Sequence, residues 1–270
     1  MRRISSRLIT ATLLVAAFGC EAGDQEQANC PQGMVRVPAN QGSSPFCMDA
    51  TEVTVAAYKQ MRESGYLPLS VPGCYMPDPF EVSWFDRAGM ERGSDYPAGG
   101  MTWCQAQAYC TWKGKRLCGA ESGEGLDLQG QDVEPELLQR TEWVSACSRH
   151  GAQAYSYGDN FNPDACPLRL EGGGFVSTAP AGSTSSCEGG YPGLFDLSGS
   201  LWEWTNACSV TANARACLAM GGAATVLPDQ IAQAEGAGRC SLDSTILLDT
   251  LTPSEVDWPE IGARCCADVP

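Results

Sequence analysis

The sequence predicts an α+β fold with much irregular structure that is rich in disulfide bonds, and three observations lead to this prediction. Of 270 residues, 30 are Gly and 17 are Pro, while only 18% are charged, which is typical of a compact, loop-rich domain and not of a helical bundle. Short segments with strand alternation and short segments with helical periodicity both occur along the chain. Finally, 15 cysteines behind an apparent export signal indicate a disulfide framework.

The N-terminal residues have the pattern of an export signal. Three arginines precede an apolar run, Leu8 to Phe18, which has the length of a signal-peptide core and is shorter than the ~18 residues that a membrane span needs. Small residues before Cys20 resemble the cleavage box of bacterial lipoproteins, in which this cysteine becomes the lipidated N-terminus; an ordinary signal peptide is the alternative. We therefore expect a signal peptide at 1–19, an acidic tether at 20–29 and one domain at 30–270.

Charge and ligand spacing exclude several classes of function. The formal net charge is −15 and no Lys/Arg cluster is present, so we expect no nucleic-acid binding. The sequence has no C-x-x-C motif and His150 is its only histidine, which excludes a Cys/His zinc site and a thioredoxin-like motif. Without Cys20 an even number of cysteines remains, as disulfide pairing requires.

The first elements are expected as two short strands and a helix. The segment Met34–Pro38 alternates apolar and polar residues, and Phe46–Met48 is a second short strand. A helix is expected from Val55 to Ser64, where Thr54 can cap the first turn and Gly65 can end the last one.

Two further helices and a polar insertion follow. The second helix is expected to begin after Thr102, which forms a capping box with Gln105, and to end at Gly114. The third is expected at Thr141–Ser148. Between these helices, Gly119–Glu136 is acidic and is predicted to be an exposed insertion.

From Gly151 onward, Gly, Ser, Pro and Asn dominate, and loops are expected. Short strands are predicted at Leu201–Trp204 and Ile261–Cys265. In the first of these, strand alternation places Trp202 and Trp204 on one face and Glu203 on the other. His150, next to the end of the third helix, is expected to be a solvated residue near its C-cap.

Several segments, taken in order, resemble one known family. They are Thr51–Thr54, Met101–Ala106, Tyr109–Trp112, Gly114–Leu117, Glu142–Trp143, Gly193–Thr205, Gly221–Gly222 and Ile261–Cys265. Together they are similar to the formylglycine-generating (sulfatase-modifying) family. The resemblance implies a single domain that is poor in regular secondary structure and related to the C-type lectin fold. The family includes copper-dependent oxidases, non-heme iron enzymes and exported members without a characterised activity.

The resemblance also implies that the oxidase chemistry is missing. The family's oxidases hold copper through two cysteines, and ungapped matching places Val226 and Ile231 at these positions. Aliphatic side chains offer no lone pair to Cu(I), which prefers soft thiolates. The iron-dependent members use several histidines, and this chain has His150 alone. The alternative is an active copper-dependent formylglycine-generating oxidase, or another modifying enzyme of the family, that would use Cys240 and a distant free cysteine.

Calcium is the metal that the resemblance implies. In the family, the segment before Trp-Glu-Trp surrounds such an ion, and Ca²⁺ takes carboxylate and carbonyl oxygens. The matching ligands are the side chains of Asp196 and Glu203 and the carbonyls of Gly199 and Leu201. The alternative is that Asp196 is a solvated turn residue and Glu203 a strand-end residue.

Three disulfides are expected. The family's bridge from the third helix to the last motif maps onto Cys147 and Cys265, and short intervening loops suggest Cys30–Cys47 and Cys208–Cys217. The function expected from all of this is a non-catalytic or diverged binding module, stabilised by calcium. It would be held at the bacterial cell envelope by a lipid on Cys20, or otherwise be periplasmic or extracellular, with an unknown protein, peptide or glycan ligand.

Overall fold

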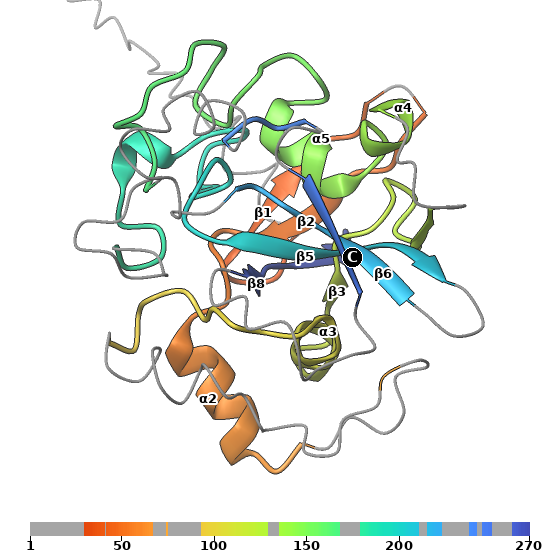
Figure 1. Cartoon of the computed structure of the whole chain (residues 1–270), viewed down its shortest axis with the longest axis vertical. Helices are drawn as coiled ribbons and strands as arrows, with labels where there is room; N and C mark the ends of the chain where they lie inside the picture. The colour runs from red at the N-terminus through yellow and green to blue at the C-terminus, as the bar shows by residue number, and fades with distance from the viewer. Residues whose placement is uncertain are drawn as a thin grey trace, which may run out of the picture.

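The computed structural model describes residues 30–40, 42–66, 74, 93–128, 135–167, 179–210, 215–222, 238–241, 245–249 and 261–270. Its helices and strands are short, and long irregular segments join them (Figure 1). The expected signal peptide and tether, with Cys20, lie outside the described residues, as do Val226 and Ile231. Within these ranges, no helix is both long enough and apolar enough to cross a bilayer.

The first sheet joins strands from both ends of the domain. Its order is β1 (Met34–Val37), β2 (Phe46–Asp49), β9 (Cys265–Asp268) and β3 (Arg116–Leu117), and all neighbours are antiparallel. The positions of β1 and β2 confirm the two strands expected from apolar alternation. Because β9 lies between β2 and β3, segments far apart in the sequence complete this sheet.

The second sheet is built around β5 (Trp202–Val210). Its order is β4 (Leu126–Asp127), β5, β6 (Arg215–Met220) and β7 (Thr245–Asp249), and β8 (Ile261–Ala263) pairs with β5 in parallel. The strand expected at Ile261–Cys265 is confirmed at Ile261–Ala263, but it ends before Arg264: β8 belongs to the second sheet, and Cys265 begins β9 of the first. Arg264 stands between the two strands and is only 1% exposed.

Each of the three expected helices begins directly after the threonine at or just before its expected start. The helix α2 (Val55–Glu63) follows Thr54, whose side chain accepts a hydrogen bond from Ala57 N. Both hydrogen bonds of the capping box are present at the start of α3 (Trp103–Trp112). Thr141 caps α5 (Glu142–Ser148). A short helix, α4 (Pro135–Leu138), precedes α5, and a 3-10 turn, η2 (Ser185–Cys187), lies in the long loop before β5.

Two apolar clusters cover the two faces of the second sheet. One joins α2 and α3 to Trp204 and Ile261, and the other joins α5, β1 and β2 to Leu197 and Leu218. Figure 1 shows β5 between α5 on one side and α3 on the other. Trp202 and Trp204 both pack against the first cluster, as the alternation of side chains along a strand predicted.

Seven disulfides join every cysteine of the sequence except Cys20. They are Cys30–Cys47, Cys74–Cys104, Cys110–Cys265, Cys118–Cys266, Cys147–Cys240, Cys166–Cys187 and Cys208–Cys217. The first and last of these agree with the pairs expected from short loops.

The expected pair Cys147–Cys265 is wrong. Cys147 bonds to Cys240, and Cys265 bonds to Cys110 in α3. Successive residues of a strand face opposite sides, and Cys265 lies in the cluster of α2 and α3 while Cys266 lies in that of α5. Cys147 is also in the α5 cluster, so the core separates it from Cys265.

The segment expected as an exposed insertion is partly buried. Gly119 N donates a hydrogen bond to Glu142 Oε2 at 2.9 Å, and Leu128 is 2% exposed. Between them, β4 pairs in parallel with β5 at Ala207 and Cys208. The expected exposure is confirmed at Glu124 and Asp127 but not at the two ends of the described part, where pairing with β5 and the bond to Glu142 hold the backbone against the domain.

Candidate functional site

The loop that leads into β5 holds the expected calcium ligands in a buried position. Asp196 is 3% exposed and Glu203 is 1% exposed, and Gly199 and Leu201 are buried with them. Asp196 and Ser200 have φ angles of 64° and 67°, in the left-handed region that side chains rarely adopt. The alternative of a solvated turn residue is therefore wrong for Asp196, whereas Glu203 does lie near the start of β5, with its side chain buried.

Glu203 is bound by an arginine and a tryptophan. Arg264 Nε donates to both carboxylate oxygens, at 3.0 and 2.9 Å, and Arg264 Nη2 donates to Oε1 at 2.7 Å. Trp143 Nε1, from α5, donates to Oε2 at 2.8 Å. A carboxylate has about four lone-pair sites that can accept hydrogen bonds. The four contacts from Arg264 and Trp143 therefore occupy the sites of Glu203.

Arg264 also binds the backbone of two other segments. Its Nη1 donates to the carbonyl oxygens of Asp49 and Ala50, at 3.0 and 3.3 Å, and its Nη2 donates to Phe195 O at 2.7 Å. Burial lowers the pKa of Arg264, but the carboxylates around it, led by Glu203, outweigh this effect and raise the pKa above its ordinary value. The guanidinium thus stays charged, and its hydrogen bonds hold together the end of β2, the loop before β5 and β5 itself.

A third carboxyl group, that of Glu52, faces the same place. Glu52 follows β2 and is 2% exposed, and neither of its carboxylate oxygens has a hydrogen-bond partner among the described residues. Burial raises its pKa well above the ordinary value, and the negative charges of Asp196 and Glu203 raise it further, while Arg264 lowers it. This residue was not expected as a site residue.

Asp196 is also perturbed by its surroundings. Burial raises its pKa, and a 2.6 Å hydrogen bond from Gly182 N to Oδ2 and the charge of Arg264 oppose that rise. Three carboxyl groups, of Glu52, Asp196 and Glu203, thus face one guanidinium in a buried cluster. An uncompensated buried charge is costly, so the cluster needs a proton or a cation.

The donor set fits a hard cation such as Ca²⁺, which prefers carboxylate oxygens. The orphaned oxygens of Glu52 and the buried Ser200 Oγ, which also has no hydrogen-bond partner in the described part of the chain, are oxygens that such an ion would satisfy. Glu203 fits less well than expected, because its oxygens already accept from Arg264 and Trp143.

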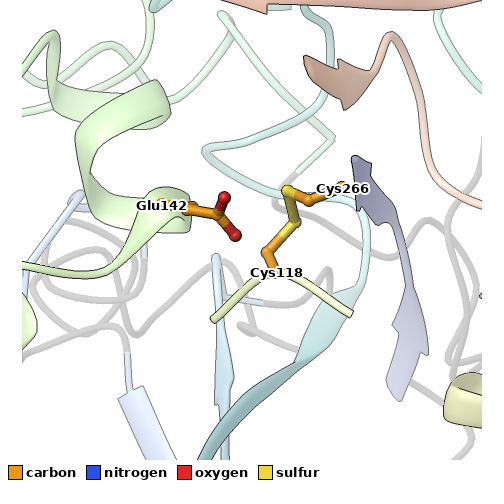
Figure 2. Close-up of side chains that lie close together, drawn as sticks. All are labelled: Cys118, Glu142 and Cys266. Atoms are coloured by element: carbon orange, nitrogen blue, oxygen red, sulfur yellow. A yellow bond between two sulfur atoms is a disulfide. The ribbon is translucent and has the colours of Figure 1, made fainter. Parts of the chain in front are cut away.

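A second group of candidate metal ligands is excluded by its chemistry. Single ligand atoms of Cys118, Glu142 and Cys266 lie within 4.8 Å of one another, and Figure 2 shows the two cysteines joined sulfur to sulfur, with the Glu142 carboxylate pointing toward them. A disulfide offers no thiolate to a metal. Glu142 is moreover bound by Arg116 at 2.6 and 2.7 Å, so this group is structural.

His150 is not solvated, contrary to expectation. Its Nδ1 lies 3.1 Å from Glu121 Oε1, and its Nε2 lies 3.0 Å from Pro38 O. The neighbouring hydroxyl of Ser145 donates to Glu121 and not to His150. Both ring nitrogens of His150 are therefore engaged with groups other than this serine.

The comparison of the sequence with known families decides the identity of the domain. The profile described as "Sulfatase-modifying factor enzyme 1-like domain" matches residues 7–244. The chain belongs to this family. The resemblance found in the ordered motifs is thereby confirmed, and so is the expected fold of the formylglycine-generating enzymes with its low content of regular structure.

Members of the family with and without activity are similar to this chain. It is 30% identical over 128 residues to "Inactive C-alpha-formylglycine-generating enzyme 2" of Bos taurus, covering 44% of this chain and 35% of that protein. It is 27% identical over 177 residues to "Formylglycine-generating enzyme" of Mycobacterium tuberculosis (strain ATCC 25618 / H37Rv), covering 61% and 48%. The matches therefore span about a third to a half of these relatives.

Solved structures of similar shape include two proteins of low identity. One is described as "Crystal Structure of CarF", with a TM-score of 0.49, 18% identity, and coverage of 84% of this chain and 87% of that one. The other is "Structure of PvdO from Pseudomonas aeruginosa", with a TM-score of 0.49, 15% identity, and coverage of 83% and 81%.

The sequence contained a signal for the two site residues that were missed. Glu52 and Arg264 both lie inside segments that match the family, at Thr51–Thr54 and Ile261–Cys265. Arg264 stands among residues of an apolar, cysteine-containing stretch, and a guanidinium in such a stretch requires a buried carboxylate. That requirement could have linked Arg264 to Glu203 before the fold was known.

Proposed function

We propose that this protein is a non-catalytic or diverged member of the formylglycine-generating family that acts as a calcium-stabilised binding module at the cell envelope. One observation supports this most strongly: all cysteines except Cys20 are paired in disulfides. A copper oxidase of this family needs two thiolates at its metal, and Cu(I) prefers soft sulfur ligands. Cys240, which the alternative would need as a free thiol, bonds to Cys147.

The similarity to a relative named as inactive supports the same proposal. Such a domain can lose the oxidising cysteines and keep its scaffold, because the scaffold depends on disulfides, two sheets and a buried ion-pair cluster and not on the catalytic metal. The ligand would be a protein, peptide or glycan, held by a domain whose loops are fixed by covalent bonds.

Calcium has a structural role in this proposal. Asp196, the carbonyls of Gly199 and Leu201, and the adjacent buried carboxylates would hold the ion. Its charge would offset the excess of negative charge around Arg264. Bound calcium would stabilise the loop that enters β5, since a ligand that binds only the folded state adds to the free energy of unfolding.

Export is also part of the proposal. Disulfide-rich domains persist in oxidising compartments, and the apolar segment before Cys20 has the form of a signal peptide. Lipidation at Cys20 would attach the domain to a membrane through the acidic tether at 20–29.

The proposal is tested by two measurements on the purified protein. Thiol titration after denaturation without reductant should find no reactive cysteine in the lipidated protein, and Cys20 alone in protein produced without the lipid. Oxygen consumption should then be followed after copper loading, with a cysteine-containing sulfatase peptide as substrate and the Mycobacterium tuberculosis enzyme as positive control. We expect no turnover above the rate without protein. Turnover comparable to that of the control enzyme would establish the alternative, an active oxidase.

A further inference from the structure

The buried carboxyl group of Glu52 has no hydrogen-bond donor among the residues that the structure describes. Its residue is 2% exposed, and both carboxylate oxygens are without a hydrogen-bond partner in the described ranges. Native proteins rarely leave buried polar atoms in this state, because an unmade hydrogen bond costs the full desolvation of the group. A cation, or a proton shared with a neighbouring carboxyl group, would satisfy these oxygens.

The groups around Glu52 are the carboxyl groups of Asp196 and Glu203, the Arg264 guanidinium and the Ser200 hydroxyl. The carboxyl group of Asp196 is near enough to that of Glu52 for the two to interact. The Ser200 hydroxyl is next to Glu52 as well, yet its Oγ makes no hydrogen bond of acceptable geometry within the described chain. Asp196 and Ser200 both hold left-handed backbone angles, of 64° and 67°, so the loop turns sharply on either side of this place.

The charges around this place separate into two sets. Glu203 and Arg264 neutralise each other through hydrogen bonds of 2.7–3.0 Å. The charge of Arg264 also acts on Glu52 and Asp196, but its hydrogen bonds to side chains go to Glu203, and neither of the other two carboxylates forms an ion pair within the described residues. Two negative charges match one divalent cation. Two carboxylates, a hydroxyl and nearby carbonyls form an oxygen-only donor set, which hard cations prefer.

We propose that Glu52 is a direct ligand of the divalent cation, opposite Asp196, and that Glu203 instead serves to hold Arg264. This inference rests on the calcium role in the proposed function and changes its ligand set. The ion would then link Glu52, which lies three residues beyond the end of β2, to the loop before β5. Because β2 belongs to the first sheet and β5 to the second, the ion would connect the two sheets. The rival arrangement is a proton shared between Glu52 and Asp196, with no ion.

The test is calorimetric titration of the EDTA-treated, purified protein with Ca²⁺, comparing the wild type with Glu52→Gln. The amide keeps the shape of the side chain and removes its charge. We expect the dissociation constant to rise at least about tenfold, since the number of charged ligands sets calcium affinity. The matched control is Glu121→Gln, which alters a partly buried carboxylate bound to His150 and Ser145 and should leave the constant within about twofold, as expected for a residue outside the ligand shell.

The outcomes separate this inference from the proposal on which it rests. If the wild type binds Ca²⁺ and Glu52→Gln binds it equally well, Glu52 is not a ligand, and the calcium role stands with the ligands expected from the family. If the wild type binds neither Ca²⁺ nor Mg²⁺, the shared proton holds and both ideas are overturned. Weaker binding in Glu52→Gln alone supports the inference.

Discussion

Replacement of Arg264 by methionine should destabilise the domain strongly. In the wild type, Arg264 donates to Glu203 and to the carbonyls of Asp49, Ala50 and Phe195. Arg264→Met would leave the Glu203 carboxylate buried without its counter-charge. Removing one partner of a buried ion pair costs about 3–5 kcal/mol, and three carbonyls lose a donor as well. At about 2–4 °C per kcal/mol for a domain of this size, the melting temperature should fall by roughly 10 °C.

The assay is urea unfolding, followed by tryptophan fluorescence, without reductant and in EDTA so that no cation offsets the change. The matched control is the double variant Arg264→Met with Glu203→Gln, which removes both charges. It should be less destabilised than the sum of the two single variants by about 1–3 kcal/mol, because the partners are in direct contact. If Arg264→Met unfolds within about 1 kcal/mol of the wild type, the reasoning about this cluster is refuted.

Two further predictions concern chain constraint and pH. Replacing Cys110 and Cys265 by alanine should lower the free energy of unfolding by about 5 kcal/mol in urea, because this bridge closes a loop of 155 residues. The same change at Cys208 and Cys217, which are 9 residues apart, should lower it by about 3 kcal/mol, because the entropy that a bridge removes from the unfolded chain grows with loop length. Equal losses would contradict this account. Burial, and secondarily the charge of Asp49, raise the pKa of Tyr109 well above its ordinary value. Unfolding therefore favours the ionised phenol, and stability should fall as pH rises above about 10, by about 1.4 kcal/mol per pH unit for this group. Urea unfolding at several alkaline pH values measures this slope. Tyr109→Phe should reduce the slope by that amount, and an unchanged slope would show that Tyr109 ionises normally.

The local elements of the fold could be predicted from sequence, because short-range chemistry determines where they begin. Thr54, Thr102 with Gln105, and Thr141 each satisfy backbone donors of the helix that follows. Such signals lie within four residues of the feature they predict. The strand β5 was expected only as far as Trp204 but continues to Val210, because pairing with β6 extends it beyond its apolar start.

Features that depend on distant partners were predicted less well. Cys147 was assigned to Cys265 by resemblance, but the direction in which a strand residue points, and hence which core it enters, depends on register that one sequence does not reveal. The calcium ligands around Asp196 stay a prediction from the resemblance, while Glu52, buried beside them, came from a segment more than a hundred positions earlier and was not expected there. Glu52 lay in a segment that resembles the family, but the sequence did not reveal that its carboxyl group would be buried beside Asp196.

The position of β9 has a consequence for the order in which the domain can form. Since this strand separates β2 from β3, the N-terminal hairpin has no neighbour on that edge until the C-terminal segment is in place. The adjacent cysteines of β9 then close bridges to α3 and to the residue after β3 across 155 and 148 positions, and contacts this far apart in sequence form slowly. The first sheet would therefore be completed late in folding, after nearly the whole chain is available.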